Sequence, residues 1–214
     1  MSVIKLHNSL GNKKEVFIPI NENHIRIYAC GPTVYNYAHI GNARMAVVCD
    51  LLVRFMKHSY PKVTYVSNIT DIDDKIINAS VETNTPIQDL TKKYEKIYNE
   101  NMLELGVLKP DIQPRATEHI KEMIALITTL IIKKYAYVSE KHVLFNVELY
   151  KNYGLLSGRN KEDQIAGSRI QVANYKKNAG DFVLWKPSTD EQPGWDSPWG
   201  RGRPGWHIEC SAMA

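Results

Sequence analysis

The residues best suited to chemistry gather where a predicted strand gives way to a predicted helix. Cys30 ends the strand-like run 24–30, the turn Gly31-Pro32 follows, and His39 precedes a long apolar segment. Glycines permit close backbone approach, and the N-terminus of a helix favours an anion such as a phosphate. His39 beside that anion could stabilise charge that develops during phosphoryl or nucleotidyl transfer. The alternative is a surface histidine in an ordinary strand–helix loop.

Cys30 and Cys210 are candidates for a metal site. Zn²⁺ prefers Cys and His ligands, and His207 and Glu209 are nearby candidates by type. The alternative is two unrelated buried cysteines, since free cysteine is among the most buried residue types. Without the compact spacing of a zinc finger, the residues alone favour that alternative. Cys49, inside the apolar segment, is expected to serve packing.

Three carboxylates, Asp71, Asp73 and Asp74, come directly after a second predicted strand. They could bind a divalent metal or anchor a substrate ammonium group. The interpretation we favour is an acidic cluster at a helix N-terminus, stabilised by the helix dipole. Thr70, at the tip of the strand, is better placed to reach a ligand.

Tryptophans and arginines are concentrated near the C-terminal end. Trp195, Trp199 and Trp206, with Arg201 and Arg203, could form a stacking platform for adenine or a nucleic acid. Tryptophans in Gly/Pro-rich loops equally serve as anchors that pin the loop to the core. The spacing does not separate these two roles.

The elements that must position these residues follow from periodicity. Residues 24–30 and 62–70 read as strands, and residues 42–57 read as a helix that is apolar on nearly all sides and is predicted to be buried against a sheet. Strand, helix and strand within this length predict a βαβ unit and a parallel sheet. Farther along, the pattern predicts a helix that is capped by Thr85 and has Pro86 at its first position. A boundary marked by prolines follows at 108–117, and then a helix around 120–131 and a hairpin at 135–147. The last predicted elements are loops at 150–180, a strand at 181–186 and the start of a final helix.

Composition sets wide bounds on function. The chain has 214 residues, a formal net charge of +4 and three cysteines. A mildly basic chain permits a polyanionic partner without requiring one. The N-terminus does not read as a signal peptide, and no apolar run approaches the roughly 20 residues of a membrane span. We therefore expect a cytoplasmic protein with free or metal-bound thiols and no membrane partner.

Five segments together resemble the cysteine–tRNA ligases (cysteinyl-tRNA synthetases), which are class I enzymes. They are YACGPTVYNYAHIGNAR, YVSNITDIDDKI, PRATEHI, GDFVLWK and SPWGRGRPGWHIECSAM, in the family's order. The resemblance runs from about Leu6 to the last residue and covers the N-terminal part of that family. It implies an α/β fold, with the first half of a Rossmann-like catalytic domain at 1–110, an α+β connective insertion at 111–193 and a return segment of the catalytic domain at 194–214.

The resemblance also implies a role for individual residues. His39 to Asn42 stand at the family's HIGH signature, with asparagine in place of the last histidine. The implied catalytic residues are His39 and Asn42. The implied ATP-binding residues are Thr33, His39, Ile40, Gly41 and Asn42. The implied cysteine-binding residues are Gly31, Thr70 and Trp206, and the implied zinc ligands are Cys30 and Cys210, without His207.

The function implied is activation of L-cysteine with ATP and Mg²⁺, followed by transfer to tRNA(Cys), with zinc reading the substrate thiol. Two further zinc ligands and the KMSKS loop of the family lie beyond Ala214, so we expect weak or no activity from this chain alone. Family members are usually monomeric. Two alternatives stay open: a ligase that joins cysteine to an amino sugar, and a non-catalytic fragment that binds tRNA or a partner chain.

Overall fold

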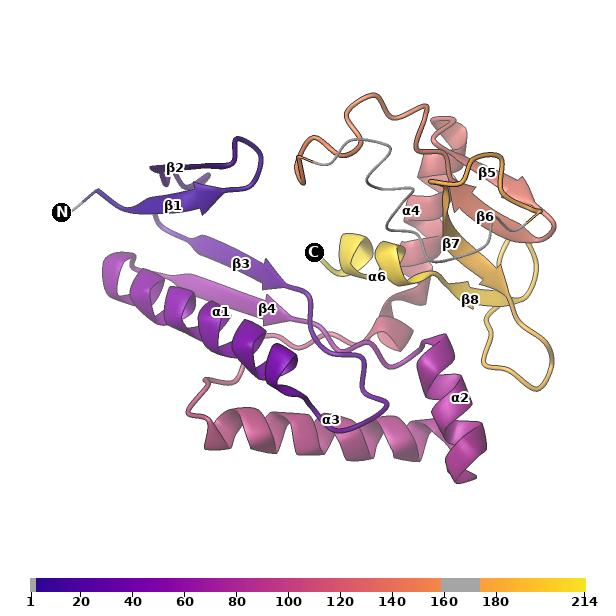
Figure 1. Ribbon diagram of the computed structural model, residues 1–214, viewed down its shortest axis with the longest axis horizontal. Helices are drawn as coiled ribbons and strands as arrows, with labels where there is room; N and C mark the ends of the chain where they lie inside the picture. Colours follow the sequence, from indigo (N-terminus) through magenta and orange to yellow (C-terminus); the bar gives the residue numbers. More distant parts are fainter. Residues whose placement is uncertain (1–2, 159–173) are drawn as a thin grey trace.

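The structure, a computed structural model, describes residues 3–158 and 174–214 (Figure 1). It opens with an antiparallel hairpin of β1 (Lys5–Asn8) and β2 (Lys13–Val16), which the sequence pattern had not indicated. The strands β3 (Ile25–Ala29) and β4 (Val63–Ser67) are parallel neighbours, and α1 (Ile40–Ser59) connects them. The predicted βαβ unit is therefore confirmed.

The proline-bearing segment after residue 110 continues this parallel arrangement. The Ser67 N–H donates to the Ile112 carbonyl at 3.1 Å, and the Ile69 N–H donates to the Pro114 carbonyl at 2.8 Å. Parallel bridges join the same stretches. The segment predicted only as a boundary thus also extends the sheet edge, where prolines are tolerated because they need not donate.

The helix α1 is buried on one face only, although its sequence is apolar on nearly all sides. Val53 and Met56 are buried against β3 and β4, as predicted. Val47, Leu51 and Phe55 are exposed, at 44%, 68% and 46%. These three residues share one face because they are four residues apart. The described elements cover the opposite face and leave this apolar stripe open.

Two helices follow β4. The first, α2 (Asp74–Thr83), begins where the acidic cluster had indicated a helix N-terminus, and it ends at Asn84 in the left-handed conformation with φ of 48°. The second, α3 (Ile87–Glu104), begins one residue later than expected, with Pro86 at the N-cap. The Thr85 hydroxyl donates to the Thr83 carbonyl and does not cap the helix, so the predicted cap was wrong.

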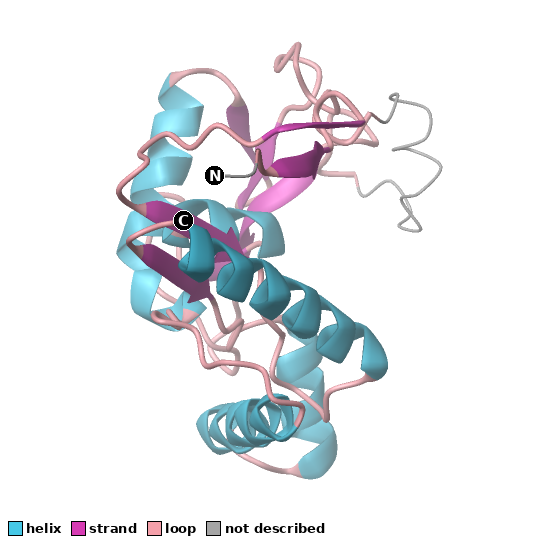
Figure 2. Ribbon diagram, turned by 90° about the vertical axis from the view of Figure 1, so that its left-hand side faces the viewer, coloured by secondary structure: helices cyan, strands magenta, loops and turns pink. Residues whose placement is uncertain are grey.

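The next part consists of helices that pack against a four-stranded sheet. It comprises η1 (Ala116–His119), α4 (Ile120–Ile132), β5 (Ala136–Ser139), β6 (His142–Phe145), β7 (Phe182–Pro187), β8 (Gly202–Pro204) and α6 (Trp206–Met213). The sheet order β5-β6-β7-β8 is antiparallel throughout. Figures 1 and 2 show this unit beside the parallel strands. The predicted hairpin and the strand at 181–186 are confirmed.

The loops predicted at 150–180 lie only partly within the described residues. The stretches 150–158 and 174–180 consist of turns and irregular structure, and 159–173 fall outside the described residues. The division into domains stays a prediction. The β8 strand, inside the expected return segment, pairs with β7 of the insertion sheet.

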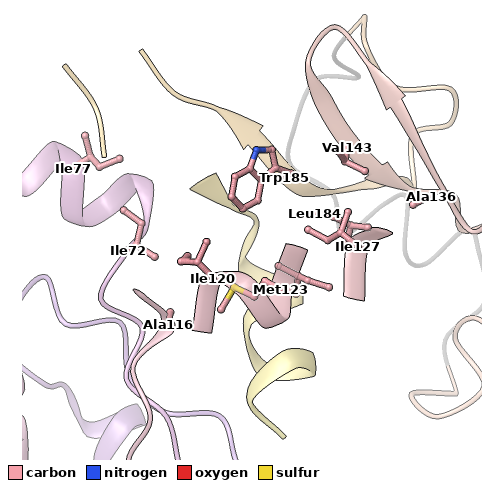
Figure 3. Packing of buried hydrophobic residues seen from close by; sticks show 11 residues of the cluster. Ile72, Ile77, Ala116, Ile120, Met123, Ile127, Ala136, Val143, Leu184 and Trp185 are labelled. Carbon is pink, nitrogen blue, oxygen red and sulfur yellow. The ribbon is translucent and has the colours of Figure 1, made fainter. Parts of the chain in front are cut away.

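The largest hydrophobic cluster ties the two units together (Figure 3). Met123 and Ile127 of α4 pack with Trp185 of β7, and all three are fully buried. Ile72, just after β4, and Ile208 of α6 belong to the same cluster. The insertion therefore shares its core with the carboxyl end of the parallel strands, which is where the candidate site lies.

Among residues 3–158 and 174–214, no helix is both long enough and apolar enough to cross a membrane.

Candidate active site

The two thiols implied as zinc ligands lie side by side. Cys30 follows β3, Cys210 lies in α6, and their Sγ atoms are 3.3 Å apart. The residues are 180 positions apart in the sequence, so their meeting depends on the return of the chain through β8 and α6. Cys49 is separate from them, since its Sγ contacts Met45 Sδ within α1. The packing role expected for Cys49 fits this position.

The hydrogen bond between the paired thiols moves their pKa values in opposite directions. The hydrogen bond with Cys30 lowers the pKa of Cys210 to about 6, although burial opposes this. The same hydrogen bond, with burial, raises the pKa of Cys30. The thiolate is the form of cysteine that binds metals. One of the two sulfurs is thus prepared to act as a ligand near neutral pH.

The spacing of the sulfurs can be compared with that around zinc. Two Zn–S bonds of about 2.3 Å at a tetrahedral angle place the sulfurs about 3.8 Å apart. A pair at 3.3 Å needs only a small opening to occupy two of the four positions. Within residues 3–158 and 174–214, however, His, Cys, Asp and Glu form no cluster of three or more that could hold an ion. The paired thiols are therefore two candidate ligands that the fold brings together.

The other candidates by type have different surroundings. His207 packs edge-on against Phe182, with ring centroids 4.9 Å apart. Glu209 is buried and accepts a hydrogen bond of 2.9 Å from the Thr70 hydroxyl. Burial raises the pKa of Glu209 to about 9, even though the Thr70 bond opposes this rise. Neither side chain is placed as a partner of the thiols in metal binding.

Gly31 occupies a position that no side chain could fill. A Cβ atom there would lie 1.6 Å from the Asn68 carbonyl oxygen. The Gly31 N–H donates to Asn68 Oδ1 at 2.9 Å, so the backbone after Cys30 is held directly against the end of β4. Thr33 and Thr70 form the next bridge between the same two segments.

The start of α1 is fixed by its own side chains. His39 is the N-cap, and its Nδ1 accepts a hydrogen bond of 3.0 Å from the Gly41 N–H. Asn42 Oδ1 in turn accepts from the His39 N–H at 3.1 Å, which completes a capping box. Asparagine at the last position of the signature therefore has a local structural use, which the sequence comparison with HIGH did not reveal.

A cavity of about 190 Å³ is lined both by Gly31, the neighbour of Cys30, and by Asn42 at this helix start. Of the predicted site residues, the structure places Gly31, Thr33, Asn42 and Trp206 around it. Thr70 is buried beneath, next to Thr33. The remaining ones, His39, Ile40 and Gly41, are exposed at the beginning of α1, beside the lining residues Ala38 and Asn42. The predicted ATP and cysteine residues thus fall in one region.

The aspartates after β4 each have a structural partner. Asp71 accepts from the Thr117 hydroxyl and backbone at 2.6 and 3.0 Å, and burial nevertheless raises the pKa of Asp71. Asp73 is the N-cap of α2. Asp74, in the first turn of α2, pairs with Arg203. The positions of Asp73 and Asp74 agree with the favoured interpretation of a helix N-terminal cluster, whereas Asp71 is held by Thr117 outside α2.

The tryptophans divide into two groups. Trp195 and Trp199 pack against the core around Trp185, which fits the role of anchors. Arg201 donates to the carbonyls of the loop itself. Trp206, in contrast, is 57% exposed and lines the cavity.

Two residues at this site had not been singled out from the sequence. Asn68 is fully buried between the thiols and Thr70. Lys75 lines the cavity and lies over the Tyr35 ring, with its Nζ 5.4 Å from the ring centroid. The available signal was their position, since both follow β4 at the carboxyl edge of a parallel sheet, where ligands bind in such folds.

The comparisons with known proteins agree with this geometry. A family model described as the tRNA synthetases class I (C) catalytic domain matches residues 16–214. The cysteine–tRNA ligase of Parvibaculum lavamentivorans is 59% identical over 98% of this chain and 45% of its own length. That of Acidiphilium cryptum is 55% identical over 100% of this chain and 47% of its own length.

A solved structure supports the fold. The methionyl-tRNA synthetase of Mycobacterium tuberculosis, solved in complex with methionyl-adenylate, matches with a TM-score of 0.61 over 88% of this chain and 46% of its own. The sequences are 12% identical, so this likeness bears on the fold alone. The predicted class I α/β fold is confirmed, and the chain spans less than half the length of the curated relatives it matches. Because the family model covers nearly all of its residues, the chain belongs to the family of class I (C) tRNA synthetase catalytic domains, and its relatives are cysteine–tRNA ligases.

Proposed function

We propose that this chain forms the cysteine-activating part of a cysteine–tRNA ligase. The reaction joins L-cysteine to ATP, giving cysteinyl-adenylate and pyrophosphate, and then transfers cysteine to tRNA(Cys). The observation that carries the proposal is the thiol pair at 3.3 Å beside the cavity that begins at Gly31 and ends at the start of α1. A class I domain with paired thiols at this place fits the recognition of a sulfur-bearing amino acid.

Cys30 and Cys210 would hold a zinc ion as two of its four ligands. When bound, the ion supplies a soft partner for the thiolate of the substrate, which separates cysteine from serine because a hydroxyl is a far poorer zinc ligand. The lowered pKa of Cys210 favours its ligand form near neutral pH. By resemblance, the family supplies the remaining two ligands from a histidine and a glutamate farther along its sequence.

The amino acid itself would lie between Gly31 and Trp206. Trp206 offers an exposed aromatic face at the cavity, and Gly31 also lines it. The Thr70 hydroxyl already donates to Glu209. Thr70 would therefore stabilise the base of the pocket and would not bind the substrate directly. Under the proposal, Trp206 and the backbone at Gly31 contact the substrate.

The start of α1 would bind the ATP phosphates, together with Mg²⁺. In His39 the Nδ1 atom accepts from Gly41, so the neutral ring carries its proton on Nε2 and can donate it to a phosphate oxygen. Asn42 keeps His39 in this position through the capping box. The positive end of the helix dipole adds to the attraction, and Thr33, Ile40 and Gly41 complete the approach.

We further propose that the acceptor is tRNA(Cys), that the protein acts as a monomer and that it is located in the cytoplasm. The relatives are named as tRNA ligases, which favours tRNA over an amino sugar as acceptor.

The test uses the 214-residue chain with and without zinc. Zinc content is measured after dialysis, and calorimetry compares the binding of L-cysteine with that of L-serine. We expect L-cysteine to bind only to the zinc-loaded chain, L-serine not to bind, and Cys210→Ser to abolish both zinc and cysteine binding. Cysteine-dependent ATP–pyrophosphate exchange is expected to be weak. Equal binding of the two amino acids, or cysteine binding by the Cys210→Ser chain, would contradict the proposal.

A further inference from the structure

A buried amide lies beside the pair of thiols. Asn68 follows β4 directly and is fully buried, so no water competes for its polar atoms. Its carboxamide oxygen accepts from the Gly31 N–H at 2.9 Å and from the Tyr28 hydroxyl at 3.0 Å. These donors stand on either side of Cys30 in the sequence. One oxygen atom thus fixes the backbone that carries the first thiol.

The same carboxamide reaches the second thiol. Cys210 Sγ lies 3.8 Å from Asn68 Oδ1, and in its protonated form the thiol donates to this oxygen. The Asn68 amide nitrogen donates to the Thr70 hydroxyl at 3.4 Å, and that hydroxyl donates to Glu209, the neighbour of Cys210 in α6. Asn68 therefore connects the end of β3 with α6 both directly and through Thr70.

The connection is expected to be strong because the Asn68 carboxamide at its centre is fully buried. Removing this acceptor would leave two half-buried donors, on Gly31 and Tyr28, without their partner. The chain could satisfy them only by moving the end of β3 toward another acceptor or toward water. Either movement shifts Cys30 relative to Cys210, since α6 is held separately by the core around Ile208.

We propose that Asn68 is the positioning residue that keeps the sulfurs of Cys30 and Cys210 side by side. This role rests on the proposed function, because a fixed distance between the two sulfurs is needed when both sulfurs bind the same ion. Asn68 does not touch the ligand in this role. It acts through the two cysteines, as outer-shell hydrogen bonds do at metal sites.

Phenylarsine oxide probes the spacing without zinc or substrate. This trivalent arsenical forms two As–S bonds with a close pair of thiols and releases its oxygen as water with the two thiol protons, so no oxidation occurs. We expect the wild-type chain to bind one arsenical, and Cys30→Ser to lose that binding. Asn68→Leu, which has a similar volume and no polar atom, should bind at least tenfold more weakly, while each single thiol stays reactive with iodoacetamide.

Asn68→Asp keeps an oxygen acceptor for Gly31 and Tyr28, so it should restore most of the arsenical binding. Asn99→Leu is the matched control, because Asn99 is a half-buried amide that pairs with Gln113 away from the thiols. Thermal unfolding followed by circular dichroism confirms that each variant is folded. If Asn68→Leu does not fold, Tyr28→Phe and Thr70→Val, which each remove one partner of the same carboxamide, take its place and should each weaken binding.

The outcomes separate this inference from the proposed function. Wild-type arsenical affinity in a folded Asn68→Leu chain, or in both replacement variants, would overturn the positioning role whatever zinc and cysteine do. Arsenical binding that depends on Asn68, in a chain that binds neither zinc nor L-cysteine, would support the positioning role and contradict the proposed function.

Discussion

Asp74 in the first turn of α2 and Arg203 in β8 form an ion pair of 2.8 Å across 129 positions of sequence. Arg203 is only 6% exposed in its side chain, and its other hydrogen bonds reach loop atoms near Pro187 and Gln192. The pair joins the carboxyl edge of the parallel strands to the last strand of the insertion sheet. It therefore helps to set the path by which α6 brings Cys210 to Cys30.

Asp74→Asn should destabilise the chain by about 1–3 kcal/mol at neutral pH, because it removes the charged partner of a buried guanidinium. Urea denaturation followed by circular dichroism measures this loss. Asp89→Asn is the matched control: Asp89 also lies in the first turn of a helix, and the described residues give it no ion pair. It should lose at most the dipole contribution of about 0.3–1 kcal/mol. Equal losses would mean that the Arg203 pair adds nothing.

The same pair predicts a pH dependence. Burial alone would raise the pKa of Asp74, but hydrogen bonds from Lys186 and Arg203 outweigh it and hold the pKa below the ordinary 3.8. A lowered pKa in the folded state stabilises the fold above the unfolded value, and this contribution disappears as the pH falls through the folded value. The stability difference between wild type and Asp74→Asn should therefore shrink when the urea titration is repeated below about pH 4. A constant difference would contradict the role of the charge.

Gly31→Ala should damage the site more than an ordinary glycine substitution does. The added Cβ would meet the Asn68 carbonyl oxygen at 1.6 Å, so β3 and β4 must separate, at a cost of about 3 kcal/mol or more. Gly106→Ala is the comparison, because Gly106 has open space around it and a φ of 76°. It should cost only about 1 kcal/mol, from the left-handed backbone. The measurement is the denaturant midpoint of each variant. Similar midpoints would show that the close contact between Gly31 and Asn68 is relaxed in solution.

The fold could be predicted where local pattern and tertiary packing agree. Alternation at 24–30 and 62–70 gave the parallel pair, because both strands face a core on one side. The stripe at Val47, Leu51 and Phe55 is equally apolar and yet exposed, since hydrophobicity does not report what lies opposite a helix face. The β8 strand was missed for a related reason: three residues rich in Gly and Pro carry no strand signal until β7 lies beside them.

Only part of the site could be predicted from the sequence, and the reason is physical. His39 and Cys30 were visible because each ends or begins a periodic segment. That Cys210 meets Cys30 came from resemblance, since a contact across 180 positions leaves no trace in spacing. Asn68 looked like an ordinary polar residue after a strand. Its importance depends on full burial and on four partners from three separate segments, which only the folded chain brings together.

Substitutions in α1 should distinguish its two apolar faces. Met56 is 1% exposed, and Met56→Ala should cost about 2–5 kcal/mol through lost burial and a cavity. Leu51 is 68% exposed, so Leu51→Ala should change stability by no more than about 0.5 kcal/mol. Denaturation of both variants at one low protein concentration provides the measurement. A large loss for Leu51→Ala would show that this face is covered in solution.

Lys75 should contribute to anion binding at the cavity, which was not foreseen from the sequence. Its ammonium lies over the Tyr35 ring and lines the same space as Asn42, so it adds a positive charge near the start of α1. Under the proposed function, Lys75→Met should weaken ATP binding about tenfold, which corresponds to about 1.4 kcal/mol, while Lys75→Arg should retain most of it. Calorimetric titration with ATP at fixed ionic strength measures the dissociation constants.

The control for Lys75 is a lysine in a similar setting away from the cavity. Lys177, which precedes β7, lies 4.5 Å from the centroid of the Tyr137 ring, and neither of these two residues lines the cavity. Lys177→Met removes the same charge and the same kind of aromatic contact, so a general loss of positive charge would affect both variants alike. We expect Lys177→Met to bind ATP as the wild type does, because screening weakens a distant exposed charge. Equal weakening by the two substitutions would assign the effect to net charge and remove Lys75 from the site.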